Sequence, residues 1–169
     1  MGLTTNMGMT ASGLYTKTAD LETPSADLNW RRAVALDSGT GAGKADLRFT
    51  DTRTLTASST EDLDLAGVLT DAFGVALTFV KIKGLFISAA AANTNNVIVG
   101  AAASNAWAAL LGATHTLTLR PGTTFGLMAG AADATTYAVT AGTGDLLKVA
   151  NSAGGTSVTY DILLIGSSV

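Results

Sequence analysis

Apolar and polar side chains alternate along much of the chain after residue 29, a pattern typical of strands that bury one face. Near the C-terminus, for example, Val158, Tyr160 and Ile162 alternate with polar neighbours. Threonine is abundant, and its β-branched side chain packs well on a pleated surface. The short segments recur roughly every 8–12 residues, which predicts an antiparallel sandwich or a barrel. The alternating segments are residues 30–36, 47–50, 54–57, 115–120 and 157–164, and turn residues delimit two further predicted strands at 124–129 and 146–150.

The longest predicted strand covers residues 77–89. Its first half has three apolar side chains on one face and two lysines pointing away: Val80, Ile82 and Phe86 against Lys81 and Lys83. After Gly84 the opposite face also becomes apolar, with Leu85 and Ile87. A change of phase centred on a glycine predicts a β-bulge at that point.

Turn residues and caps predict how the strands are connected. The sequence Arg120-Pro121-Gly122-Thr123 predicts a turn that joins strands 115–120 and 124–129 as a hairpin. Residues 59–74 open with cap-type and acidic side chains, which predicts a strand as far as Leu65 and then one helical turn. Residues 102–111 are predicted to form a loop or a short helix.

The first 29 residues show no clear period and are predicted to form an extended N-terminal arm. This arm is either a frayed terminus or a segment that docks on a neighbouring subunit. Met7, Met9, Leu14 and Tyr15 make it more apolar than a disordered tail requires. Residues 30–169 are predicted to form a single β-sandwich domain.

Charge is distributed unevenly along the chain. Of twenty-three charged side chains (10 basic and 13 acidic), eighteen lie in residues 1–83 and five in residues 84–169. A neutral surface made of Ala, Gly, Thr, Ser and Asn is best explained if it packs against copies of itself or a partner. We therefore expect like subunits to meet through residues 84–169 and a different partner to bind residues 1–83.

Other compositional features exclude several classes of function. The net charge of −3 and the single basic pair Arg31-Arg32 do not indicate nucleic-acid binding. The absence of cysteine excludes disulfides, thiolate metal sites and cysteine nucleophiles. Residues 84–119 are uncharged, but Asn-rich breaks at 93–96 and 104–105 divide them into pieces too short to span a membrane.

One segment, residues 38–45, comes close to a phosphate-binding loop. The motif requires Gly-x-x-x-x-Gly-Lys-Ser/Thr ahead of a helix. Here Ser38 replaces the first glycine and Ala45 replaces the hydroxyl residue, and a strand pattern follows instead of a helix. We interpret the segment as a glycine turn between two strands.

The remaining candidates for chemistry are a lone histidine and a group of acids. His115 shares its parity with Leu117 and Leu119, which places it at a strand end beside the core as a structural residue. Four carboxylates lack the spacing of a calcium loop and are interpreted as helix-start or edge residues: Glu61, Asp62, Asp64 and Asp71. The prediction is a protein that is not an enzyme, with no catalytic, cofactor-binding or metal-binding residues and no cofactor.

The order of several segments resembles small structural proteins of tailed bacteriophages and prophages. The resemblance covers roughly residues 30–169 and includes no functional motif, so no site residue is carried over. The segments that carry it are residues 52–55, 62–67, 71–74, 77–85, 93–96, 120–122 and 160–166.

The resemblance implies a capsid decoration, or cement, protein. Such a protein would be an all-β, jelly-roll-like sandwich with at most one or two short helices. It would assemble as a homo-oligomer, with a homotrimer favoured, bind the major capsid protein on the capsid exterior of the virion, and bridge neighbouring capsid subunits. Alternatives are a phage tail, neck or host-receptor-binding protein and, from another class, a carbohydrate-binding module or small hydrolase.

Overall fold

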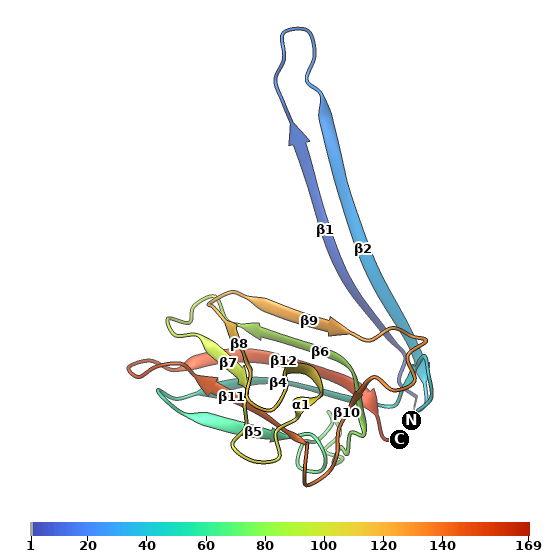
Figure 1. Ribbon diagram of the computed structural model, residues 1–169, viewed down its shortest axis with the longest axis vertical. Coiled ribbons are helices and arrows are strands. Elements are labelled where there is room, and N and C mark those ends of the chain that lie inside the picture. The colour runs from blue at the N-terminus through green and yellow to red at the C-terminus, as the bar shows by residue number, and fades with distance from the viewer. Residues whose placement is uncertain (1) are drawn as a thin grey trace.

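The computed structural model describes residues 2–169 as an almost entirely β-stranded protein with one short helix (Figure 1). The predicted all-β class is confirmed. The N-terminal elements are β1 (Thr5–Thr16), β2 (Ser25–Ser38) and β3 (Lys44–Ala45). The body contains β4 (Leu47–Leu55), β5 (Thr60–Asp64), β6 (Lys81–Ala89), β7 (Val97–Gly100), α1 (Ala108–Leu111), β8 (Thr116–Leu119), β9 (Thr124–Met128), β10 (Tyr137–Ala138), β11 (Leu146–Asn151) and β12 (Val158–Ser167).

The body strands form two antiparallel sheets. In the first sheet the order is β10-β6-β12-β4, with β9 also paired to β6, and in the second it is β5-β11-β7-β8. Strands that are early in the body sequence pair with strands that are late in it. The first pairs with the last (β4–β12), the second with the one before the last (β5–β11), and the inner strands pair as β6–β9 and β7–β8. The body therefore has the strand pairing of one long antiparallel hairpin whose successive pairs are divided between the two sheets.

The main core contains buried side chains from both sheets. Ile82 and Leu164 belong to the first sheet, Val97 and Val149 to the second, and each is at most 2% exposed. Trp107 joins this cluster from the loop before α1, and its indole Nε1 donates a hydrogen bond to the carbonyl of Ala138 at 2.8 Å. Burial of this shared core is what holds the two layers together.

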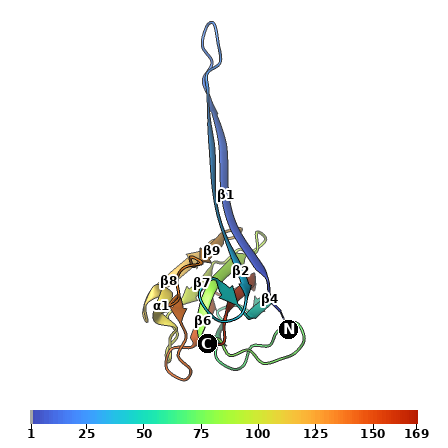
Figure 2. The ribbon, with the colours of Figure 1, turned by 90° about the vertical axis from the view of Figure 1, so that its right-hand side faces the viewer.

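The N-terminal segment forms a long antiparallel hairpin that projects from the body. Strand β1 pairs with β2 over twelve positions, from Thr5↔Leu36 to Thr16↔Ser25. Figures 1 and 2 show the ribbon leaving one end of the body and extending well beyond it. The pairing of β1 with β2 extends to Leu36, past the predicted arm boundary at residue 29, and β2 itself ends at Ser38. The predicted half-buried strand at residues 30–36 is therefore a strand, but it belongs to this hairpin.

The base of the hairpin packs on the outer face of the first sheet. A second cluster of buried residues joins Met7 and Leu36 of the hairpin to Ala45 of β3 and Ile165 of β12. Strand β3 pairs in parallel with the end of β2, at Asp37↔Lys44. Among residues 2–169, the outer face of the first sheet is thus covered at one end only.

A β-bulge interrupts the central pairing of β6 with β12, one residue from the predicted position at Gly84. Ile165 pairs with Gly84 and Gly166 with Ile82, so Lys83 is the extra residue. The bulge brings Ile82 to the same core as Leu85, whereas Phe86 packs in the outer cluster. The prediction that Ile82 and Phe86 share a face is therefore wrong, because the bulge reverses the alternation between them.

The predicted hairpin over residues 115–129 is also wrong. Its turn is present, since the Thr123 amide donates to the carbonyl of Arg120 at 2.9 Å and Gly122 has a φ of 78°. However, β8 pairs with β7 in the second sheet and β9 pairs with β6 in the first. The Pro-Gly turn carries the chain from one layer to the other.

Several local predictions are settled by the same structure. The short helix α1 falls within residues 102–111, as expected. Residues 60–64 form the predicted strand, but the residues after it form turns, with the Asp64 carboxylate accepting a hydrogen bond from the Ala66 amide at 2.8 Å. The predicted strands 47–50 and 54–57 belong to one continuous strand, β4, which ends at Leu55.

We predict that Gly166→Ala destabilises the fold at the bulge. A Cβ at this position would collide with the Lys81 carbonyl oxygen and would lie 2.7 Å from the ring of Phe79. Overpacking of this kind costs about 1–3 kcal/mol of unfolding free energy, measurable by urea denaturation. Gly67→Ala, where a Cβ meets nothing within 4 Å, is the control and should change stability by less than about 0.5 kcal/mol. Equal effects of the two substitutions would contradict this account of the bulge.

Candidate functional site

The two faces of the projecting hairpin differ in polarity. Side chains of directly opposed residues in an antiparallel pair lie on the same face. The pairs Ala11↔Trp30, Gly13↔Leu28 and Tyr15↔Ala26 therefore share one face. We call these six residues the distal strip. The alternate pairs place mostly polar residues on the other face: Thr10 with Arg31, Ser12 with Asn29, Leu14 with Asp27 and Thr16 with Ser25.

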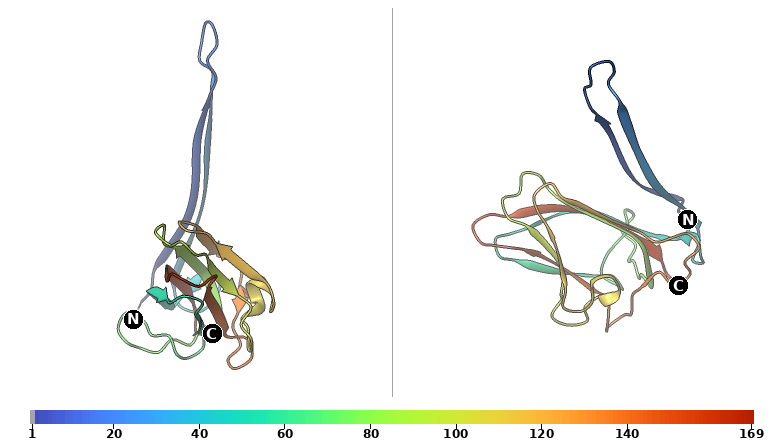
Figure 3. Two further views of the ribbon diagram at one scale, coloured as in Figure 1. Left: turned by 90° about the vertical axis from the view of Figure 1, so that its left-hand side faces the viewer. Right: turned by 45° about the horizontal axis from the view of Figure 1, so that its top comes forward.

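Burial along the apolar face falls from the base of the ribbon to its tip. Met7 is 3% exposed and is seated on the sheet, with the partly buried Val34 beside it. Further out, Trp30, Leu28 and Tyr15 are 40%, 58% and 77% exposed. The distal strip continues a surface that is already used for packing, and within the described chain its large side chains remain exposed. Both views of Figure 3 show the outer part of the hairpin standing clear of the body.

Charged groups border the distal strip at both ends, and one of them, the guanidinium of Arg32, lies over the ring of Trp30. The guanidinium of Arg32 stacks over the Trp30 ring, 5.3 Å from its centroid, and donates a hydrogen bond to the carbonyl of Arg31 at 3.0 Å. The connecting loop carries Lys17, Asp20 and Glu22, with Leu21 fully exposed between the two acids. The ribbon thus presents a neutral apolar strip with charge at both ends.

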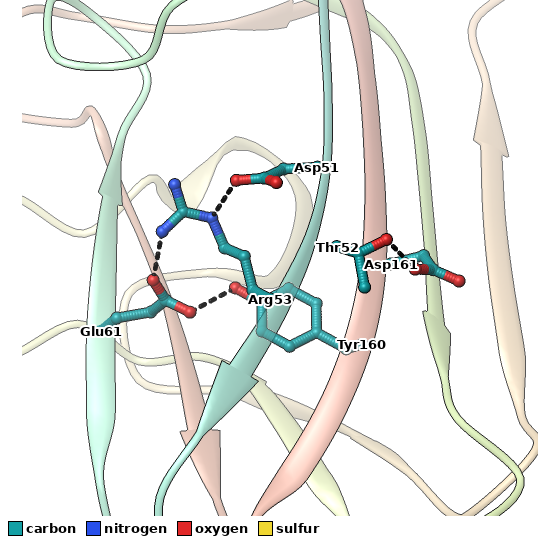
Figure 4. A network of polar contacts seen from close by, with 6 residues as sticks. All are labelled: Asp51, Thr52, Arg53, Glu61, Tyr160 and Asp161. Atoms are coloured by element: carbon teal, nitrogen blue, oxygen red, sulfur yellow. Dashed lines mark hydrogen bonds and ion pairs between the residues drawn. The ribbon is translucent and has the colours of Figure 1, made fainter.

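Inside the body, a polar network joins the two sheets (Figure 4). Glu61 on β5 accepts a hydrogen bond from the Tyr160 hydroxyl of β12 at 2.7 Å and one from the Arg53 guanidinium of β4 at 2.5 Å. Arg53 also pairs with Asp51 at 3.0 Å. Burial, together with the Glu61 carboxylate, raises the pKa of Tyr160 well above its usual range. Because every charge in it is paired, the network acts as a structural tie between the layers.

The glycine loop at residues 38–45 contacts the positively charged side chain of Lys83 from the same chain, and this contact uses the loop's carbonyl groups. Its carbonyl oxygens at Thr40, Gly41 and Lys44 accept hydrogen bonds from the ammonium of Lys83, with Nζ 2.7 Å from the Gly41 oxygen. A phosphate loop would instead direct amide groups inward. The interpretation as a turn between two strands is confirmed.

Lys83 itself was predicted to point away from the apolar face, yet it is only 2% exposed. Burial lowers the pKa of Lys83, and the charge of Lys81 adds to this effect while Asp46 opposes it. The bulge directs the side chain into the loop, where the three carbonyls replace its hydration shell. Alternation alone does not predict this burial, because it treats Lys81 and Lys83 alike.

The other predicted site candidates are not brought together by the fold. His115 lies just before β8 at a strand end, as predicted, but is exposed and not beside the core. The carboxylate of Asp71 accepts backbone hydrogen bonds from Phe73 and Val75 in its own turn. In the described part of the chain, no three His, Cys, Asp or Glu side chains gather as a metal site would require.

Two of the asparagines that interrupt the uncharged segment hold loops in place with their side chains. Asn95 donates to the Asn151 side chain at 2.9 Å and to the carbonyl of Ala153 at 3.0 Å. Asn93 accepts a hydrogen bond from the Thr159 amide and donates one to its carbonyl, both at 2.8 Å, as a strand residue would. These side chains therefore replace missing backbone partners at one end of the sheets.

The uneven distribution of charge along the sequence places many charged side chains at one edge of the body and few at the opposite edge. Strands β4 and β5 lie at one edge and β8 and β9 at the opposite edge of the two sheets. Residues 101–144, which include the second edge, hold only Arg120 and Asp133 as charged residues. The charged side chains of the first edge are Arg48, Asp51, Arg53, Glu61, Asp62 and Asp64.

Sequence reasoning missed the hairpin, although a signal for it exists. Apolar or small residues occupy odd positions from Met7 to Tyr15, and even positions from Ala26 to Leu36 repeat the pattern apart from Arg32. Two matched alternations on either side of a polar loop are typical of a hairpin. The glycines and threonines of the first strand concealed its period.

Comparison of the chain with protein-family models, with curated proteins and with solved structures finds no match. Within residues 2–169, no helix has the length and apolar character needed to cross a membrane. The geometry of this chain itself, and above all its hairpin, therefore provides the basis for a functional proposal.

We predict that Tyr160→Phe lowers the free energy of unfolding by about 1–2 kcal/mol at neutral pH, because Glu61 loses a buried hydrogen bond. The native pKa of Tyr160 is raised, so the contribution of the hydroxyl is fully present below about pH 10, the unfolded value. It should decrease as the pH rises further, since the unfolded chain then releases a proton that the native state retains. Urea denaturation across this range, with the exposed Tyr15→Phe as control, measures the effect. A pH-independent difference between wild type and Tyr160→Phe would contradict it.

A second prediction concerns the buried lysine. Lys83→Met should lower the free energy of unfolding by about 1–3 kcal/mol, because carbonyls of the 38–45 loop lose their donor. Amide exchange in that loop should become faster as well. The matched control is Lys81→Met, two residues earlier on the same strand, with an expected change below about 0.5 kcal/mol. A Lys83→Met protein as stable as wild type would show that the contact contributes no net stability.

Proposed function

We propose that this protein is a structural subunit of a tailed-phage virion that decorates the capsid and stabilises it by bridging neighbouring capsid subunits. The proposed working form is a homo-oligomer, with a homotrimer favoured, that binds the major capsid protein on the outside of the particle. The observation that carries the proposal is the projecting hairpin, whose distal strip extends away from the body with its large side chains exposed.

The strand order supports a jelly-roll reading of the body. A jelly roll has eight strands in two sheets, and viral capsid proteins use this architecture. The inward matching of strands, from β4–β12 to β7–β8, is the ladder expected of such a wrapped sheet. On this reading, β10 is a short addition beside β9 on the edge of the first sheet.

The charge asymmetry supports a division of contacts. We propose that the nearly uncharged β8–β9 edge faces like subunits, because neutral surfaces associate without the cost of desolvating charges. The charged β4–β5 edge would then face a different partner, the capsid lattice. Bridging is mechanical in this scheme: many modest contacts repeated by symmetry resist internal pressure through avidity.

A second candidate function is that of a tail, neck or host-receptor-binding component. The feature that favours it is the loop at the hairpin tip, where Leu21 is fully exposed. A tip of this kind could insert into a neighbouring tail protein or a cell-surface receptor. The location of the protein in the particle separates the two candidates.

The test is a binding experiment with expanded capsids of the phage or prophage that encodes the chain. We expect the purified protein to bind, to raise capsid resistance to heat or chelator, and to lie on the capsid exterior in electron micrographs of virions. Loss of resistance without the protein and restoration on adding it back would support the proposal. Density at the tail, or binding to bacterial cells with capsids unaffected, would favour the second candidate instead.

A shortened hairpin provides the matched variant for this experiment. Deleting residues 11–30 and joining Thr10 to Arg31 through Asn-Gly keeps Met7 and Leu36 seated on the sheet. Thermal unfolding checks that the body is intact. We expect capsid occupancy to fall at least about tenfold as avidity is lost. Full occupancy by this variant would show that the hairpin plays no part in attachment.

A further inference from the structure

The outer part of the hairpin has too few contacts to be stable alone. A two-stranded ribbon without a third strand or a packed face is marginally stable in water. The base of this ribbon satisfies that requirement through Met7 and its neighbours on the sheet, but nothing in the described part of the chain packs on the large side chains of the distal strip in this way. An ordered ribbon therefore requires that something covers the strip.

The shape of the distal strip fits a copy of itself. Each of its three cross-strand pairs combines a large side chain with a small one: Trp30 with Ala11, Leu28 with Gly13 and Tyr15 with Ala26. The large member lies on β2 in the first two pairs and on β1 in the third. The strip is therefore a series of projections beside hollows, so that a second copy can place its large side chains over the small residues of the first.

Electrostatics and continuity favour the same partner. The six residues of the strip are uncharged, and Arg32 over the Trp30 ring is the one charged residue next to them on this face of β1 and β2, so a strongly charged partner surface would lose hydration and gain at most that single ion pair. The same apolar face, nearer the base, already packs on a surface of this chain formed around Ile165. A neutral apolar surface of the same protein is thus the type of surface that this ribbon face contacts.

The size of the strip indicates how copies are arranged. Five residues along each of two strands cover on the order of 200 Å², well below the roughly 800 Å² per partner of a stable pairwise interface. A closed ring, in which each ribbon meets two neighbours and the bodies also touch, multiplies this contact. In a closed ring every copy has its strip covered, whereas an open chain of copies would leave strips exposed at its ends.

We propose that the distal strip is a self-association surface, on which the hairpins of two or more copies of this chain pack with their apolar faces toward a common axis. This deepens the oligomer assumed in the proposed function by naming its surface. It does not depend on the capsid, because the purified protein alone tests it.

The experiment compares two neighbouring substitutions that introduce the same charge on opposite faces. Leu28 lies in the strip, whereas Asn29 lies on the polar face opposite Ser12. Sedimentation and light scattering of the full chain at about 1–100 μM should show an oligomer for wild type and Asn29→Asp. Leu28→Asp should weaken association at least about tenfold, because it buries an unpaired charge. Thermal unfolding of each variant confirms an intact body.

Cysteine cross-linking gives a second measurement that does not depend on disrupting the strip. The chain contains no cysteine, so Ala11→Cys and Ser12→Cys each introduce a single thiol. A short bis-maleimide should join copies through Ala11→Cys, in the strip, much more efficiently than through Ser12→Cys, on the opposite face.

Three outcomes would overturn the inference. They are a wild-type protein that is monomeric up to about 100 μM, equal effects of Leu28→Asp and Asn29→Asp, and equal cross-linking by the two cysteine variants. If only a different protein covers the strip, the purified wild-type protein will be monomeric, which is the first of these outcomes. An oligomer lost in Leu28→Asp supports the inference even if capsids are not bound, in which case the proposed function fails and the self-association surface stands.

Discussion

The pairing of β6 with β12 is the contact on which the rest of the molecule depends. Both strands are apolar on both faces over part of their length, because Leu164 points into the core while Ile165 points out of it. A sheet with two apolar faces must be covered on both sides. The second sheet covers one side, and the base of the hairpin covers part of the other. The bulge at Lys83 sets where this outer cover begins, because it decides which side chains turn outward.

The sequence allowed the class of fold to be predicted, but not the partners of each strand. Alternation in segments such as 157–164 correctly identified buried positions, because that pattern depends on local geometry alone. Pairing depends on which edges meet in space, so the turn signal at Pro121 and Gly122 predicts a hairpin where the chain in fact crosses between layers. Burial of Lys83 also escaped prediction, because the carbonyls that receive it lie about forty residues earlier in the chain. The distal strip was missed because its small residues, Gly13 and Ala11, weaken the apolar signal.

Polar groups in this protein fix positions that apolar packing leaves free. A hydrophobic core tolerates sliding between layers, whereas the hydrogen bonds of Glu61 to Tyr160 and Arg53 form at one relative position of the sheets. Lys83 does the same for the loop beneath the hairpin. With few large aromatic side chains available, such contacts restrict the number of alternative packings. The neutral outer surfaces are left available for association.

The length of the hairpin has a mechanical consequence. Hydrogen bonds of an antiparallel ribbon run perpendicular to its strands, so a load that draws one strand past the other along the ribbon acts on all the rungs between β1 and β2 together. A sideways load is different, because it acts through a long lever on the few contacts at the base, around Met7 and the loop held by Lys83. The protein should therefore resist tension along the ribbon far better than bending across it, which suits a tether between neighbours more than a strut.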